Sequence, residues 1–147
     1  ITDGQIFLES SLFFSGMRPA VNVGLSVSRV GGDAQTKAMK KAAGSLRIDL
    51  AQYREMEVFT QFSSDLDDAT KEQLEYGSGL MELLKQPLGK PMSLADKVIT
   101  LCAARHKVML GIPTAKVKGF QMDMLSYFAE LSQKIVEIAE EFKKSRC

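Results

Sequence analysis

The sequence predicts a mostly α-helical protein, in which a C-terminal helical bundle follows a strand-rich remnant of an α/β domain. Charge is the first observation behind this prediction, because only four of the 37 charged residues fall in the first 32 positions. Periodicity is the second. Short apolar runs bounded by glycine and proline occupy the first part, and apolar residues at three- and four-residue steps follow from Gln35 onward. We therefore expect two units, residues 1–34 and residues 35–147.

The first unit contains three strand-like segments. Residues 5–8 alternate toward apolar, residues 20–23 follow a proline, and residues 24–30 are predicted to form a buried strand that glycines close. Such segments are typical of the edge of an α/β domain. Because the chain begins inside a strand-like segment and without an initiator methionine, we expect it to be a fragment of a longer protein.

The second unit is predicted to contain at least four helices. Apolar residues from Met39 to Met56 indicate the first, and Gly44 weakens it by about 1 kcal/mol relative to alanine. Ser64 begins the second, with Asp67 three residues later as in a capping box. That helix ends near residue 86, and the glycines at 77 and 79 are a candidate kink or break.

Two further helices complete the unit. Ser93 repeats the start signal with Asp96 three residues later, and the helix ends before Gly111. The last helix has the clearest pattern, with apolar residues at Val117, Phe120, Met124, Phe128, Leu131, Ile135, Ile138 and Phe142. We expect it to dock on the bundle. A long coiled coil is the alternative, and it needs about four sustained heptads.

Bulk composition argues against several classes of protein. A net charge of +1 argues against a basic nucleic-acid-binding protein and gives no polybasic membrane signature. No apolar run approaches the ~18 residues of a membrane span. Cys102 and Cys147 are too few for a disulfide framework, so we expect both to be reduced.

The chain by itself lacks a complete active site. It has no phosphate-binding loop, because its one Gly-Lys pair, Gly89-Lys90, is followed by a proline that cannot donate a backbone N–H. His106 is the sole histidine and is expected on the surface, so no metal site is predicted. Ser26 and Ser28 have no neighbouring base, which leaves a hydrolase triad unsupported.

One arginine stands out for its surroundings. Arg29 lies at the end of the otherwise uncharged run VGLSVSRVGG, residues 23–32. A guanidinium has five donors in a planar fork, which suits phosphate. The alternative is an arginine that pairs with a local carboxylate or extends to solvent.

This run and its flanking sequences resemble the alpha subunit of the rotary F-type ATP synthase. The segments that carry the resemblance are ITDGQIFLE, RPAVN, SVSRVG, AQTKAMK, LAQYRE and DLDDAT. The resemblance implies that residues 1–34 finish a nucleotide-binding domain and that residues 35–147 form the C-terminal helical domain.

The resemblance also implies roles for single residues. Arg29 matches the arginine finger that reaches the catalytic nucleotide on a neighbouring beta subunit, and Ser26 matches a position required for activity. Arg18 and Pro19 match the loop that packs against the adenine of a second, non-catalytic nucleotide. Phe13 lies at the matching aromatic position.

Gln86 matches a glutamine that hydrogen-bonds the adenine edge. After it, Leu88 and Gly89 replace a second glutamine and a tyrosine of the family.

The implied function is that of a regulatory, non-catalytic nucleotide-binding subunit in proton-coupled ATP synthesis or hydrolysis. The cofactors would be ATP or ADP with Mg²⁺ in the full subunit, with none held by the fragment alone. The partners would be beta subunits in an alternating hexamer and a central shaft subunit, and nucleic acid is not expected.

The complex would lie peripheral to an energy-transducing membrane, contacting it only through its other subunits. That location would be the cytoplasmic face of a bacterial plasma membrane or an organellar inner membrane. Two alternatives are a freestanding helical interaction module and the same region of a related hexameric secretion ATPase.

Overall fold

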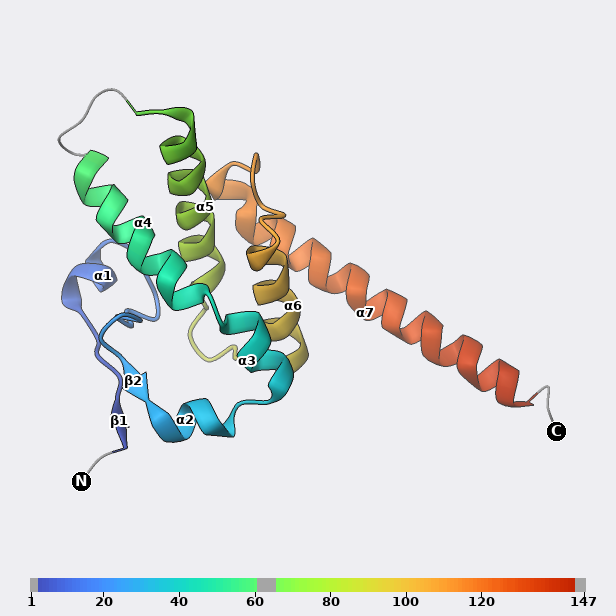
Figure 1. Cartoon of the computed structure of the whole chain (residues 1–147). Coiled ribbons are helices and arrows are strands. Elements are labelled where there is room, and N and C mark those ends of the chain that lie inside the picture. Colours follow the sequence, from blue (N-terminus) through green and yellow to red (C-terminus); the bar gives the residue numbers. More distant parts are fainter. Residues whose placement is uncertain (1–2, 61–65, 145–147) are drawn as a thin grey trace.

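The computed structural model describes residues 3–60 and 66–144, with side chains through Glu141 (Figure 1). In chain order the elements are β1 (Gly4–Gln5), α1 (Ser10–Phe14), β2 (Val27–Ser28), α2 (Arg29–Ala34), α3 (Lys37–Ala43), α4 (Leu46–Thr60), α5 (Asp68–Leu84), α6 (Leu94–Arg105) and α7 (Thr114–Lys144). The predicted class is therefore confirmed: the chain is mostly helical, with one small sheet at its N-terminal end. No helix in the described ranges is both long and apolar enough to cross a membrane.

Side-chain caps begin α3, α5 and α6. Thr36 accepts a hydrogen bond from the Met39 N–H, and Ser93 accepts one from the Asp96 N–H, as predicted for Ser93. The predicted start at Ser64 falls outside the described residues, and α5 begins at Asp68 instead. Asp67 caps it by accepting from the Thr70 N–H.

A small apolar core joins α4, α5, α6 and the start of α7. Its buried members are Leu50, Leu80, Leu83, Ala104, Met109 and Val117. The predicted break in α5 is wrong, because the helix runs unbroken through Gly77 and Gly79. A Cβ at Gly77 would collide with the ring of Tyr53, so this glycine lets α4 and α5 pack closely.

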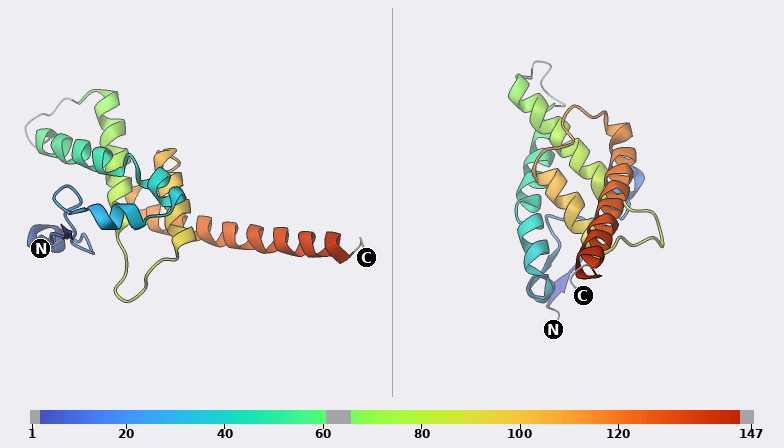
Figure 2. Two further views of the ribbon diagram at one scale, coloured as in Figure 1. Left: turned by 60° about the horizontal axis from the view of Figure 1, so that its bottom comes forward. Right: turned by 90° about the vertical axis from the view of Figure 1, so that its right-hand side faces the viewer.

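The long helix predicted through Gly44 is divided there into α3 and α4. Gly44 forms the C-cap of α3, and the Ser45 carbonyl accepts from the Ile48 and Asp49 N–H groups as α4 begins. Gly44, which was predicted to weaken a single long helix, is therefore the residue where the chain changes direction. The two helices then diverge in direction (Figure 2).

The predicted strands are largely wrong. β1 and β2 are two residues each and pair antiparallel, and residues 20–23 contribute only an isolated bridge between Val21 and Leu8. The run 24–30 is not a buried strand, since Val27 and Ser28 are exposed and α2 begins at Arg29. A strand needs neighbouring strands to satisfy its backbone, and no further strand flanks these in the described ranges.

The prediction that the last helix docks on the bundle holds only for its first turns. Val117 and Gln121 are buried, but every residue from Ser126 to Glu141 is exposed. The last helix is longer than the two helices against which it packs. α5 and α6 have 17 and 12 residues, about 26 and 18 Å, whereas the 31 residues of α7 span about 46 Å. The C-terminal half of α7 therefore extends away from the rest of the molecule (Figures 1 and 2).

Candidate functional site

Four of the predicted site residues line one pocket. Phe13 comes from α1, Arg18 and Pro19 from the following loop, and Gln86 from the loop after α5. The pocket has a volume of about 840 Å³, within the usual range for small-molecule sites. Its remaining lining residues are Ala20, Pro87, Leu88, Gly89, Lys90 and Pro91. The fold thus brings together residues that lie about 70 positions apart in the sequence.

Short-range contacts hold these residues together. The Gln86 N–H donates to the Arg18 carbonyl at 2.8 Å, which joins the two loops. The Arg18 guanidinium carbon lies 4.3 Å from the centroid of the Phe13 ring, a cation–π arrangement. The peptide bond between Arg18 and Pro19 is cis.

The outer rim of the pocket is a tight turn. The Lys90 N–H faces the Pro87 carbonyl at 3.4 Å, and Gly89 has a φ of +72°, a conformation that favours glycine. Leu88 is fully exposed at this turn. Leu88 and Gly89 therefore form the rim of the pocket.

A buried polar network anchors the loop that carries Gln86. Lys118 on α7 donates to the carbonyls of Leu83 and Lys85 and to Gln121 Oε1. Gln121 Nε2 in turn donates to Thr100 Oγ1 at 3.1 Å. Burial lowers the pKa of Lys118, and the nearby Glu82 carboxylate opposes this shift.

Sequence reasoning missed this network. The available signal was a pair of polar residues, Lys118 and Gln121, inside the apolar stripe of the last helix. Polar side chains on a buried helix face are uncommon unless they are hydrogen-bonded. Here Lys118 caps the carbonyl end of α5, directly before Gln86, and Gln121 joins Lys118 to Thr100 of α6.

The pocket is suited to a flat heterocycle with a hydrogen-bonding edge. Most of its lining side chains are apolar, and the Gln86 amide makes no side-chain hydrogen bond to another residue that the structure describes. An amide offers both a donor and an acceptor to such an edge. Arg18 and Lys90 are the two cations among the lining residues, and either could face an anionic group on the same ligand.

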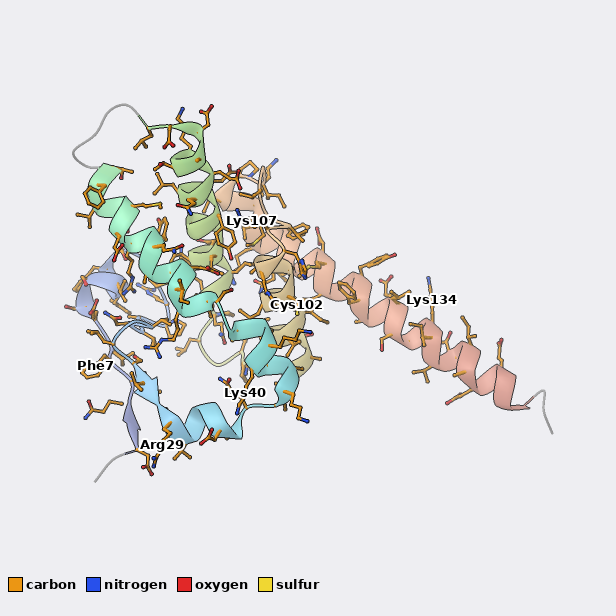
Figure 3. All side chains as sticks on the ribbon, viewed as in Figure 1. Phe7, Arg29, Lys40, Cys102, Lys107 and Lys134 are labelled. Atoms are coloured by element: carbon orange, nitrogen blue, oxygen red, sulfur yellow. The ribbon has the colours of Figure 1, made fainter. Side chains whose placement is uncertain are left out.

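Arg29 lies outside this pocket. It is the first residue of α2, directly after β2 (Figure 3), and its side chain is 84% exposed. Its guanidinium lies 3.9 Å from the carboxylate of Asp3, which is also exposed. An exposed ion pair at that distance contributes at most about 1 kcal/mol, so Arg29 remains free to contact another molecule.

Ser26 does not contact Arg29 by hydrogen bond. Its hydroxyl accepts from the Phe7 N–H at 3.0 Å and donates to the Asn22 carbonyl. Ser26 therefore fastens the turn that precedes β2 to the segment that follows β1. This is a structural role that positions the strand leading to Arg29.

Asn22 is the second feature that sequence reasoning missed. It is 7% exposed, and its side-chain oxygen accepts from the Leu25 N–H and from Arg54 Nη1 of α4. Its amide nitrogen donates to Glu9 Oε1. One buried side chain thus links the N-terminal segment to the bundle, and no sequence pattern marked it.

Comparisons with known proteins agree on one family. The family described as "ATP synthase alpha/beta chain, C terminal domain" matches residues 35–146. ATP synthase subunit alpha of Petrotoga mobilis is 56% identical over 151 aligned residues, which cover 98% of this chain and 30% of that protein. The alpha subunit of Rickettsia bellii is 52% identical, covering 99% of this chain and 28% of its own length.

The alpha subunit of Lawsonia intracellularis is 54% identical, with 93% of this chain and 27% of that protein covered. The chain thus spans less than a third of the length of these curated relatives.

Proposed function

Because the chain belongs to the ATP synthase alpha/beta C-terminal domain family, on the alpha-subunit side, we propose that it forms the C-terminal part of an alpha subunit of a rotary, proton-translocating ATP synthase. The observation that carries this proposal is the high identity to alpha subunits over nearly the whole chain, which includes the segment before the helical domain. A freestanding interaction module would not require that segment to match as well.

In this proposal Arg29 is an arginine finger for a catalytic nucleotide on an adjacent beta subunit. Its exposure supports the role, because a finger must leave its own subunit to reach the neighbour's phosphates. The bonds of Ser26 and Asn22 support it as well, since they fix the turn before β2 and so limit where Arg29 can point. A fixed guanidinium stabilises charge that develops on phosphoryl oxygens without reorganising at the moment of reaction.

The pocket is proposed to take the adenine of a second nucleotide, bound with Mg²⁺ and not turned over. Gln86 would hydrogen-bond the base edge, while Phe13 and Pro19 would contact the ring face. The chain has no phosphate-binding loop, so the phosphates and the metal would be held by other parts of the full subunit. The chain alone should bind ATP only weakly.

The remaining parts of the proposal concern organisation. Residues 1–34 would finish the nucleotide-binding domain, and residues 35–147 would form the helical domain facing beta subunits and the central shaft. The complex would sit peripherally on an energy-transducing membrane, with the cytoplasmic face of a bacterial plasma membrane as the proposed side.

A chimera tests the proposal. This chain would replace the matching part of the Petrotoga mobilis alpha subunit, and the product would be mixed with that organism's beta and shaft subunits. We expect a complex that hydrolyses ATP, and we expect Arg29→Ala to assemble equally well but lose turnover. A chimera that folds but does not assemble, or an Arg29→Ala complex with full turnover, would refute the assignment.

A further inference from the structure

The peptide group between Lys85 and Gln86 is held from two sides. Its carbonyl accepts a hydrogen bond from Lys118 Nζ of α7, and its N–H donates to the Arg18 carbonyl at 2.8 Å. Because a peptide group is planar, two bonds at its opposite ends restrict both its position and its tilt. Gln86 follows directly, so these two bonds determine where its side chain enters the pocket.

Lys118 makes further bonds at the end of α5. Its ammonium has three N–H donors, and each has an acceptor: the carbonyls of Lys85 and Leu83 and the side-chain oxygen of Gln121. Hydrogen bonds from a charged donor are roughly twice as strong as neutral ones, and positive charge is favoured at the carbonyl end of a helix. Lys118 is also half-buried, so water competes less for these bonds.

Gln121 holds the ammonium in place. Its side-chain oxygen accepts from Lys118 at 2.9 Å, and its Nε2 donates to Thr100 Oγ1 of α6 at 3.1 Å. Gln121 and Thr100 are each only 4% exposed. The start of α7 lies against both α5 and α6 (Figure 1). A chain of hydrogen bonds therefore runs from the interior of the bundle to the peptide group that precedes Gln86.

We propose that Lys118 is a positioning residue for nucleotide binding: it holds the peptide group between Lys85 and Gln86 so that the Gln86 amide meets the edge of the base. This role rests on the proposed function, in which the pocket takes an adenine. Lys118 does not line the pocket, so it acts through Gln86 and not on the ligand. The Gln86 amide makes no side-chain hydrogen bond to the rest of the described chain, so its backbone is what places it.

A helix cap that only stabilises the fold is the alternative role for Lys118. Removing such a cap would lower the free energy of unfolding, whatever residue stands at position 86. The effect of a positioning residue on ligand affinity disappears instead once the group that it positions is gone. The two roles are therefore separated by whether the effect of Lys118 on ATP affinity depends on the Gln86 side chain.

Isothermal titration calorimetry of the chimeric alpha subunit, without beta subunits, tests the proposal. Lys118→Met keeps an apolar stem and removes the ammonium. It should weaken the binding of ATP with Mg²⁺ by about threefold to tenfold, no more than Gln86→Ala does, because it acts through one base contact. The affinity for inorganic tripolyphosphate with Mg²⁺ should not change, since that ligand has no base. Lys116→Met is the matched control, because Lys116 is exposed on the same helix, and it should change neither affinity.

A double variant tests the route through Gln86. When Gln86→Ala is already present, Lys118→Met should change ATP affinity by less than about twofold, because two changes that remove the same contact are not additive. Lys118→Gln is a second variant, whose shorter stem should not let its amide reach both carbonyls, and it should behave as Lys118→Met does. Urea denaturation shows which variants are folded.

Equal losses of affinity for ATP and tripolyphosphate would overturn the proposal, as would an equal loss of ATP affinity with and without the Gln86 side chain. Lys118 would then act as a helix cap alone. Unchanged ATP affinity in a folded Lys118 variant would also overturn it, provided that Gln86→Ala weakens ATP. If Gln86→Ala itself leaves ATP affinity unchanged, the assignment of the pocket to the base is wrong, and the positioning role is lost with it.

Discussion

The N-terminal segment and the helical bundle are held together by different interactions. In the segment from Asp3 to Gln35, the buried residues are Met17 and Asn22, and hydrogen bonds around Asn22 fix the chain. In the bundle, a contiguous apolar cluster around Leu80 and Val117 supplies most of the burial. The proposed finger lies on the first region, whereas the loop that carries Gln86 is anchored by the second.

This difference has a consequence for function. An apolar core resists local distortion because it is close-packed, whereas a segment held by a few polar contacts can open locally without unfolding the rest. The Asn22 side chain joins Arg54 of α4 to the Leu25 N–H in the turn before β2. We therefore expect substitutions in the N-terminal segment to change activity or local protection. Substitutions in the core of the bundle should instead lower the free energy of global unfolding.

The largest expected effect belongs to the exposed segment. In the assembled chimera, Arg29→Lys should reduce ATP turnover at least about 1,000-fold, since lysine keeps the charge but lacks the planar fork. Nucleotide affinity should change far less, because an interaction confined to the transition state alters rate rather than binding. Single-site turnover and nucleotide affinity would be measured on the same complex.

Arg105→Lys is the control for this prediction, because Arg105 is also exposed but lies at the end of α6. An affinity loss as large as the rate loss would mean that Arg29 acts in ground-state binding. Unchanged turnover would mean that Arg29 serves only in the ion pair with Asp3.

The bundle should respond through stability. Leu80 has no exposed surface, so Leu80→Ala should lower the free energy of unfolding by about 3 kcal/mol through lost burial and the resulting cavity. Urea denaturation of the chain measures this. Leu88→Ala is the matched control, since Leu88 is fully exposed and its loss should cost less than about 0.5 kcal/mol. Equal effects would show that the core is not where the structure places it.

Asn22→Ala should cost about 2 kcal/mol, because it leaves the Leu25 N–H, Glu9 and Arg54 without their partner. Hydrogen exchange should show lost protection between residues 7 and 26 while α5 and α6 keep theirs. Gln52→Ala, on the exposed surface of α4, is the control. Loss of protection throughout the bundle would mean that the two regions unfold together, contrary to the comparison above.

In the chimera, Gln86→Ala should weaken nucleotide held by the alpha subunit by about 1.5 kcal/mol, roughly tenfold, since one hydrogen bond to the base is lost. Turnover should fall much less, because the pocket and Arg29 are separate. Gln133→Ala on the exposed part of α7 is the control. Unchanged nucleotide occupancy would contradict the assignment of Gln86 to the base.

The smallest effect concerns Tyr76 in the bundle, whose hydroxyl donates to Asp49. Burial, with the Asp49 charge, raises its pKa to about 12, whereas the unfolded chain should titrate near 10. The unfolded state therefore loses the proton first. The stability from this group is full below about pH 10 and falls as the pH rises toward 12.

Tyr76→Phe should cost about 1 kcal/mol at pH 8 and should flatten the loss of stability between pH 10 and 12 relative to the original chain. Denaturation of both proteins at several pH values measures the difference. Tyr127→Phe is the control, since Tyr127 is 65% exposed and should leave the slope unchanged. A steeper loss of stability with pH in the Tyr76→Phe variant than in the original chain would mean that folding lowers the pKa of Tyr76 rather than raising it.

Local chemistry in the sequence determined the helices and several of their ends. Ser93 begins α6 because its hydroxyl can cap the first turn, and Gly44 ends α3 at the residue where helix propensity is lowest. Core positions such as Leu50 followed from helical periodicity. The grouping of Phe13, Arg18 and Gln86 came from family resemblance instead, since no periodicity relates residues so far apart.

Only the tertiary structure decided what lies against each segment. Strand-like sequence near Arg29 did not make a buried strand, because strands depend on partners that the sequence pattern does not specify. The apolar stripe of α7 identified a face but not its occupant, and the shorter α5 and α6 cover only its first turns. Asn22 gave no local signal, and the polar pair of Lys118 and Gln121 did not show which groups it would bind. The hydrogen bond between Asn22 and Arg54 and the one between Lys118 and the Leu83 carbonyl join residues more than 30 positions apart, and such contacts exist only once the chain has folded.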